Sequence, residues 1–71
     1  MTIQQIEYVL AVAESRSINS ASKNLYISQS RLSGAIRELE QEIGVTIFDR
    51  TNRGIRVTPE GQEFLGYARQ V

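Results

Sequence analysis

Only about three residues separate two stretches of helical periodicity in this sequence. Asn19 is a good N-cap residue for a short helix that continues through Ala21 and Leu25. Ser28 is the next N-cap residue, and it begins a helix that ends at Gly44, where a missing Cβ suits a left-handed C-terminal residue. Two helices with so short a connection must pack across each other. The sequence therefore predicts a helix-turn-helix.

A further helix is predicted on each side of this pair, and a hairpin is predicted before the last helix. Apolar residues that step by three and four predict a first helix over residues 3–15. Two β-like runs, 47–50 and 55–58, flank the turn-rich tetrad 51–54 and predict the hairpin. The sequence TPEG then begins the last helix, with threonine as N-cap and proline at the first helical position. The predicted fold is mainly α: a winged helix-turn-helix with three helices, a two-stranded wing and the start of a fourth helix.

Composition excludes several classes of function. The 71 residues suffice for one domain with a modest core, and they include neither cysteine nor histidine. Without cysteine there are no thiolate metal sites, and without histidine the commonest metal ligand and the commonest general base are missing. We therefore expect no metal, no cofactor and no catalytic residues. No apolar run approaches the ~20 residues of a membrane span, and the N-terminus lacks the basic segment of a secretory signal. We expect a cytoplasmic protein without a membrane partner.

The charges are unevenly distributed, although the formal net charge is zero. Residues 15–37 contain four cations and no acid, and residues 50–56 contain three arginines and no acid. The acids gather elsewhere, mainly over residues 38–49 and 60–63. Two basic segments favour nucleic acid as a partner, with scattered solvated charge as the alternative interpretation.

The helix predicted over residues 28–43 has an unusual outward face. Its apolar side chains gather on one side, and the opposite side carries Ser30, Gly34, Arg37 and Gln41. A glycine inside a helix costs roughly 1 kcal/mol relative to alanine, so its presence needs a reason. The first half of this face is small or basic and the second half is acidic, which suits a helix that enters the DNA major groove by its N-terminal end. The alternative is that serine and glycine are merely tolerated on a solvated face.

The run ESRSINSASKNLYISQSRLSGAIRELEQEIGVTIFDR, followed by Thr58 and Gly61, resembles the N-terminal domain of LysR-type transcriptional regulators. The resemblance covers essentially the whole sequence. It implies a winged helix-turn-helix DNA-binding domain over residues 1–58, with the recognition helix 28–43 in the major groove and the wing 47–58 near the minor groove. It also implies the start of a linker or dimerisation helix at 59–71. We therefore expect a fragment of a longer regulator, without its ligand-sensing domain.

The resemblance implies roles for individual residues. The expected DNA-binding residues are Gln29, Ser30, Arg31, Ser33, Gly34, Arg37, Arg50, Asn52 and Arg53. Arg37 matches a position that commonly meets phosphate, whereas Arg50 either touches phosphate or holds the wing by pairing with Glu40. Family members usually have a small residue in place of Arg31 and a longer polar or basic residue in place of Gly34. We expect Arg31 to read a base, with a phosphate contact as the alternative.

The expected partners are double-stranded DNA with an inverted-repeat site and further copies of this chain, as a homodimer or higher homo-oligomer. A small-molecule effector is expected only for the missing sensing domain, and the protein is expected at the nucleoid. The dimer is expected to form through an apolar stripe of the fourth helix, which comprises Phe64, Leu65, Ala68 and Val71. The alternative for Leu65 is that it closes the core. A winged-helix module that binds protein and not DNA is the other function considered, and salt-dependent DNA binding separates the two.

Overall fold

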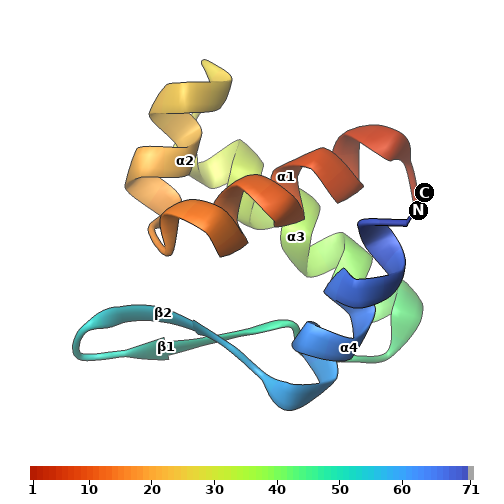
Figure 1. The fold of residues 1–71 in the computed structure, drawn as a ribbon. Helices are drawn as coiled ribbons and strands as arrows, with labels where there is room; N and C mark the ends of the chain where they lie inside the picture. Colours follow the sequence, from red (N-terminus) through yellow and green to blue (C-terminus); the bar gives the residue numbers. More distant parts are fainter. Residues whose placement is uncertain (71) are drawn as a thin grey trace.

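The computed structural model describes residues 1–70 and has the order helix, helix, helix, hairpin, helix (Figure 1). The helices of this part are α1 (Ile3–Ser15), α2 (Ile18–Leu25), α3 (Gln29–Ile43) and α4 (Pro59–Ala68). The strands β1 (Phe48–Thr51) and β2 (Gly54–Val57) pair antiparallel, and we call them, with their loop, the wing. The predicted winged helix-turn-helix is confirmed. No helix within residues 1–70 is long and apolar enough to cross a bilayer.

Each helix begins at a side-chain N-cap whose hydroxyl accepts the backbone N–H three residues on. These N-caps are Thr2, Ser17, Ser28 and Thr58. The predictions at Ser28 and Thr58 are confirmed, as is the left-handed C-cap at Gly44. The prediction of Asn19 as the N-cap of the second helix is wrong. Ser17 takes that position in extended conformation, so the helix begins at Ile18, two residues earlier than predicted.

The wing has a tighter loop than predicted. Thr51 pairs with Gly54, so both belong to strands and only Asn52 and Arg53 form the loop. The Thr51 hydroxyl accepts the N–H of Arg53 at 3.2 Å and donates to the carbonyl of Gly54 at 3.1 Å. Gly54 has a φ of +117°, a conformation that other residues rarely adopt. These contacts add one pair at the loop end of the ladder. At the other end the prediction is wrong, because Ile47 and Thr58 lie outside the strands.

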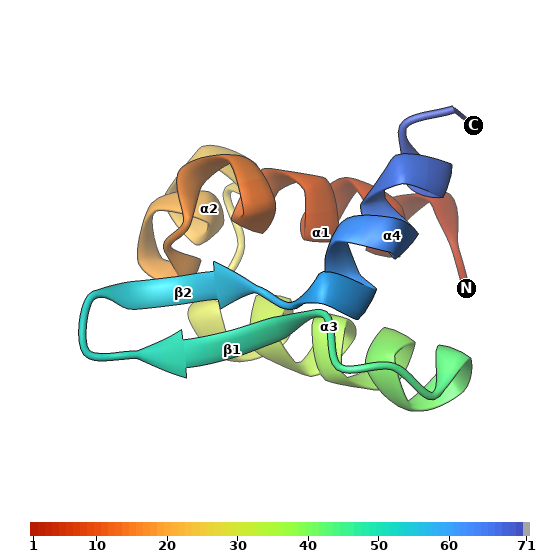
Figure 2. The ribbon, with the colours of Figure 1, turned by 60° about the horizontal axis from the view of Figure 1, so that its bottom comes forward.

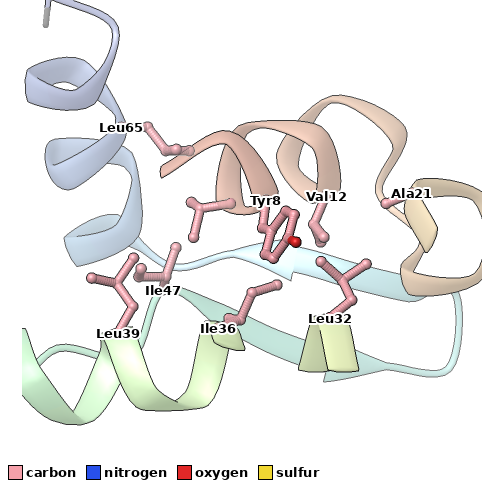
Figure 3. Packing of buried hydrophobic residues seen from close by; sticks show 9 residues of the cluster. Tyr8, Val12, Ala21, Leu32, Ile36, Leu39, Ile47 and Leu65 are labelled. Atoms are coloured by element: carbon pink, nitrogen blue, oxygen red, sulfur yellow. The ribbon is translucent and has the colours of Figure 1, made fainter. Parts of the chain in front are cut away.

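The core lies between α1, α3 and the base of the wing, and α2 and α4 close its two ends (Figure 3). Leu32, Ile36 and Leu39 form the buried side of α3, at the predicted helical spacing. Ala21 and Ser22 are buried where α2 meets its neighbours, and their small side chains permit the close approach of the helices.

Ile47 is the point at which α3, the wing and α4 meet. Its side chain is fully buried, and its N–H donates to Oε2 of Glu40 at 2.7 Å. The same carboxylate oxygen accepts the N–H of Phe48 at 3.2 Å. On the other side, the carbonyl of Ile47 accepts the N–H of Thr58 at 2.9 Å and its hydroxyl at 3.3 Å. The base of the wing is therefore fixed to α3 by Glu40 and to the start of α4 by Thr58.

Gly61, in the first turn of α4, packs directly against the backbone of Ile47. A Cβ atom at position 61 would lie 2.4 Å from the Ile47 carbonyl oxygen and 3.0 Å from its Cα. Real Cβ atoms do not approach backbone so closely, and the hydrogen bonds of Ile47 prevent it from moving aside. Only glycine fits at this position.

The apolar side of α4 is largely used by this chain's own core. Leu65 is 1% exposed and points toward α1, and Ala68 is 7% exposed (Figure 3). The expectation that Leu65 and Ala68 belong to an exposed stripe is therefore wrong, and the alternative for Leu65 is confirmed. The physical reason is size, because so small a domain needs α4 to cover its core at Ile47. Phe64 is half-buried against the core, and Val71 lies outside the described residues.

Alanine at position 61 is expected to lower the free energy of unfolding by about 2 kcal/mol, because the new Cβ overlaps the Ile47 carbonyl. Gly66 offers a matched control in the same helix, since nothing lies within 4 Å of a Cβ built there. Gly66→Ala should raise the stability by about 0.5–1 kcal/mol through helix propensity. Urea denaturation of both variants measures the difference, and stabilisation by both would contradict the close packing.

Removal of the Glu40 carboxylate is expected to destabilise the fold by about 2 kcal/mol, because two partly buried N–H groups lose a charged acceptor. Glu38 lies on the same helix and is exposed, and its side chain makes no hydrogen bond or ion pair within residues 1–70. Glu38→Ala should therefore change the stability by less than about 0.5 kcal/mol. Equal midpoints of thermal unfolding for Glu40→Ala and Glu38→Ala would show that Glu40 does not anchor the wing.

Candidate nucleic-acid interface

The turn between α2 and α3 leaves the N-terminal end of α3 open to solvent. Tyr26 ends α2 in a left-handed conformation with a φ of 58°, and the N–H of Ile27 donates to the carbonyl of Ser22 at 3.1 Å. Helix α3 starts directly after this turn, with Gln29, Ser30 and Arg31 all exposed in its first residues. The predicted end of the recognition helix is thus accessible.

The outward side of α3 is free of core contacts. Ser30, Arg37 and Gln41 are exposed on it, opposite the buried leucine and isoleucine side chains. Gly34 lies between them, and nothing lies within 4 Å of a Cβ built on it. The glycine is therefore not required by packing within this chain, in contrast to Gly61.

The flank of α3 that faces the wing forms a small hollow of about 100 Å³. Ser33 and Arg37 line it from α3, and Arg50 lines it from β1. Glu40 also reaches this hollow, and Oε2 of its carboxylate accepts the two backbone N–H groups at the wing base. Within residues 1–70 the ion pairs join the N-terminal amine to Glu42 and Arg56 to Asp49, so no pair between Arg50 and Glu40 is seen.

A second, larger hollow of about 390 Å³ lies between the wing and the junction of α1 and α2. It is lined by Arg16, Ser17, Ile18, Arg50, Thr51, Arg53, Gly54 and Ile55. Three of these residues are arginines and none is acidic. Because Ile18, Arg50 and Ile55 line both hollows, the basic lining runs continuously from Arg37 on α3 to Arg53 at the wing loop.

Arg16 is the member of this basic surface that the sequence analysis missed as a site residue. It lies between α1 and α2 with a φ of 56°, and a Cβ on Gly54 would lie 3.4 Å from its carbonyl oxygen. The basic segment 15–37 contains it, but only the fold brings it to the wing. Arg56 is set apart from the group, because it pairs with Asp49 at 3.1 Å.

Arg31 and Gly34 lie on the other flank of α3. They line a hollow of about 450 Å³ with the first turns of α1, including Thr2 and Gln5. The structure therefore divides the predicted DNA-binding residues between the two sides of one helix. Ser33, Arg37, Arg50 and Arg53 gather toward the wing, whereas Arg31 and Gly34 lie toward the start of α1.

The two signs of charge gather toward different ends of the domain. The wing loop, with exposed Asn52 and Arg53, and helix α4 lie at opposite ends in both ribbon views (Figure 2). Exposed acids lie on α4 at Glu60 and Glu63 and in the second half of α3. Within residues 1–70, no three histidine, cysteine, aspartate or glutamate side chains are placed to hold a metal ion.

Residues 3–62 match the family of bacterial regulatory helix-turn-helix proteins called the lysR family. The HTH-type transcriptional regulator ClcR of Pseudomonas putida is 42% identical over all of this chain and 24% of its own length. The DNA-binding transcriptional dual regulator OxyR of Escherichia coli K12 is 41% identical over all of this chain and 23% of its own length. The chain thus spans about a quarter of the length of these relatives.

Solved structures agree with the sequence match. CbnR, a LysR family transcriptional regulator, superposes with a TM-score of 0.94 at 37% identity, over 99% of this chain and 24% of its own. The BenM DNA-binding domain, in a complex with catB site 1 DNA, gives a TM-score of 0.93 at 37% identity, over 99% of this chain and 79% of its own. The chain belongs to the LysR family of bacterial transcriptional regulators and has the fold of their helix-turn-helix DNA-binding domain.

Proposed function

We propose that this domain binds double-stranded DNA sequence-specifically, with the N-terminal half of α3 in the major groove and the wing near the adjacent minor groove. The observation that carries the proposal is the continuous basic lining beside α3 and the wing, whose larger hollow contains three arginines and no acid. An uncompensated cluster of this kind attracts a polyanion. The similarity to a BenM domain that was solved with DNA supports the same function.

The small outward side of α3 suits insertion into the groove. The major groove of B-DNA admits an α-helix and presents a distinct pattern of donors and acceptors for each base pair. Gln29, Ser30 and Ser33 supply polar side chains near the leading end of α3, and Gly34 allows the backbone to approach closely. We assign base contacts to these residues.

The arginines on the wing side are assigned to phosphates. Arg37, Arg50 and Arg53 lie along one flank of α3 and the wing, and Arg16 extends the same surface to the junction of α1 and α2. Phosphate contacts position the protein on the duplex without reading its sequence. We expect Arg50 to act on DNA and not through Glu40, with which it forms no ion pair within residues 1–70.

A dimer that matches an inverted-repeat site remains part of this proposal. Because Leu65 and Ala68 are buried within the chain, the large apolar side chains that α4 still offers to a partner are the half-buried Phe64 and Tyr67, which is 65% exposed. The full-length protein is inferred to be a transcriptional regulator and not an enzyme, as its relatives are regulators. A protein that acts on chromosomal DNA is expected at the nucleoid.

Alanine substitutions of Arg37 and Arg53 should each weaken binding to every DNA sequence, because each removes a phosphate contact. The slope of log K against log salt concentration should become shallower by about 0.9 for each phosphate that the variant no longer neutralises. Fluorescence anisotropy of a labelled duplex over a series of salt concentrations measures both quantities. Arg69→Ala, at the end of α4, makes the same change in net charge and should leave the slope unaltered. Unchanged slopes for Arg37→Ala and Arg53→Ala would place these residues away from DNA.

Arg31 is predicted to read a base, with guanine as the preferred partner because its O6 and N7 accept two hydrogen bonds from arginine. Arg31→Ala should then relax discrimination at one base pair by roughly 1–3 kcal/mol and affect non-specific binding less. Gly34→Arg should instead raise affinity for all sequences without loss of stability, since the position is open and arginine favours helix. Selection from a random DNA pool by wild type and Arg31→Ala decides the matter. Identical selected motifs with uniformly weaker binding would reduce Arg31 to a phosphate contact.

A further inference from the structure

A hydrogen bond between two side chains links the first turns of α2 and α3. Nε2 of Gln29 donates to Oδ1 of Asn19 at 3.0 Å. Both residues are exposed, and this is the only side-chain pair that joins two helices by a hydrogen bond within residues 1–70. We propose that Asn19 is a positioning residue, which holds the carboxamide of Gln29 in the orientation that reads adenine. The inference rests on the proposed function, because it assumes that α3 enters the major groove.

The chemistry of the carboxamide explains what Asn19 contributes. A glutamine side chain ends in one carbonyl oxygen and an NH₂ group with two N–H donors. When one N–H is donated to Asn19, the carbonyl oxygen and the second N–H remain available to DNA. That remaining pair of one acceptor and one donor complements adenine, which presents the N6 amino group and the N7 acceptor in the major groove. Guanine presents two acceptors there, so it is complemented by two donors and not by one donor and one acceptor.

The restraint also selects between two orientations of the same group. An exposed glutamine rotates freely about its side-chain bonds, and its oxygen and nitrogen exchange places when the terminal bond turns by half a revolution. In this structure Asn19 presents its Oδ1, which only accepts, so it holds the nitrogen end of Gln29 and leaves the oxygen end free. This arrangement biases the orientation of the side chain before DNA arrives, and less conformational entropy is then lost on binding.

The side chain of Asn19 has no structural duty that would explain the contact otherwise. Ser17, and not Asn19, caps α2, and the bond from the Ser22 hydroxyl goes to the backbone carbonyl of Asn19. Its neighbour Ile18 lines both hollows that carry Arg50. Asn19 thus contacts the leading end of α3 through Gln29 and directly follows a residue of the basic surface beside the wing.

The test compares base preference among four variants of the whole domain: Gln29→Ala, Asn19→Ala, Asn19→Asp and the double alanine variant. Selection from a random pool by wild type and Gln29→Ala first identifies the base pair that Gln29 reads. Duplexes that differ only at this pair are then titrated. We expect wild type to prefer adenine there by about 5- to 150-fold, as one bidentate contact provides. Asn19→Ala should reduce this preference at least about threefold, with an unchanged Tm.

The conservative variant separates positioning from folding. Asn19→Asp keeps an acceptor for the N–H of Gln29, so the preference for adenine should return, although the added negative charge lowers affinity for every sequence. The double variant should show the same preference as Gln29→Ala alone, because Asn19 acts only through Gln29. Ser20→Ala changes the exposed neighbour in α2, whose side chain makes no hydrogen bond within residues 1–70, and should change nothing.

The possible negative results distinguish a failure of the inference about Asn19 from a failure of the proposed function. If Gln29→Ala abolishes the preference and Asn19→Ala retains it in full, Asn19 is not a positioning residue and the proposed function stands. A base other than adenine at the Gln29 position, or no change of motif in Gln29→Ala, also overturns the inference while DNA binding stands. Absence of DNA binding by wild type at low salt overturns the proposed function itself, and the inference with it.

Discussion

The backbone of Ile47 is the mechanical centre of this domain. Its N–H is held by a carboxylate from α3, its carbonyl is held by the N-cap of α4, and Gly61 of α4 packs so closely against it that only glycine fits there. Three consecutive elements, α3, the wing and α4, thus meet at one residue. The wing leaves the core from this point, so its direction relative to the recognition helix is set by the hydrogen bonds that hold the backbone of Ile47. A stable angle between helix and wing is what two adjacent grooves of a duplex require.

Local signals predicted the elements of the fold correctly. Threonine or serine before an apolar helical pattern, and a glycine after it, act within a few residues and need no knowledge of the tertiary structure. The caps at Ser28, Gly44 and Thr58 were predicted for this reason. Asn19 shows the limit of prediction from local signals, since serine and asparagine are both good N-caps and Ser17 lies only two residues before Asn19. Which one caps the helix depends on where Ile18 packs, and that depends on the fold.

The candidate site was harder to predict, because its properties arise from contacts between distant segments. Arg16 belongs to the basic surface only because the wing folds back against the junction of α1 and α2. Glu40 carries the right charge to pair with Arg50, yet its Oε2 accepts two backbone N–H groups, and it forms no ion pair with Arg50 within residues 1–70. Leu65 looks like a surface residue on a helical pattern and closes the core instead. In each case the residue type was informative, and its partner was not visible in the sequence.

The separation of charge between the wing and α4 has a further physical consequence. A body without net charge feels little overall pull from a polyanion, but one with opposite charges at its two ends experiences a torque. The field of the duplex therefore turns the domain as it approaches, so that Arg16, Arg50 and Arg53 lead and Glu60 and Glu63 trail. At 0.1 M salt this rotation acts only within about 10 Å, the screening length. The charge pattern then raises the fraction of collisions that arrive in a productive orientation, which is an effect on the rate of association.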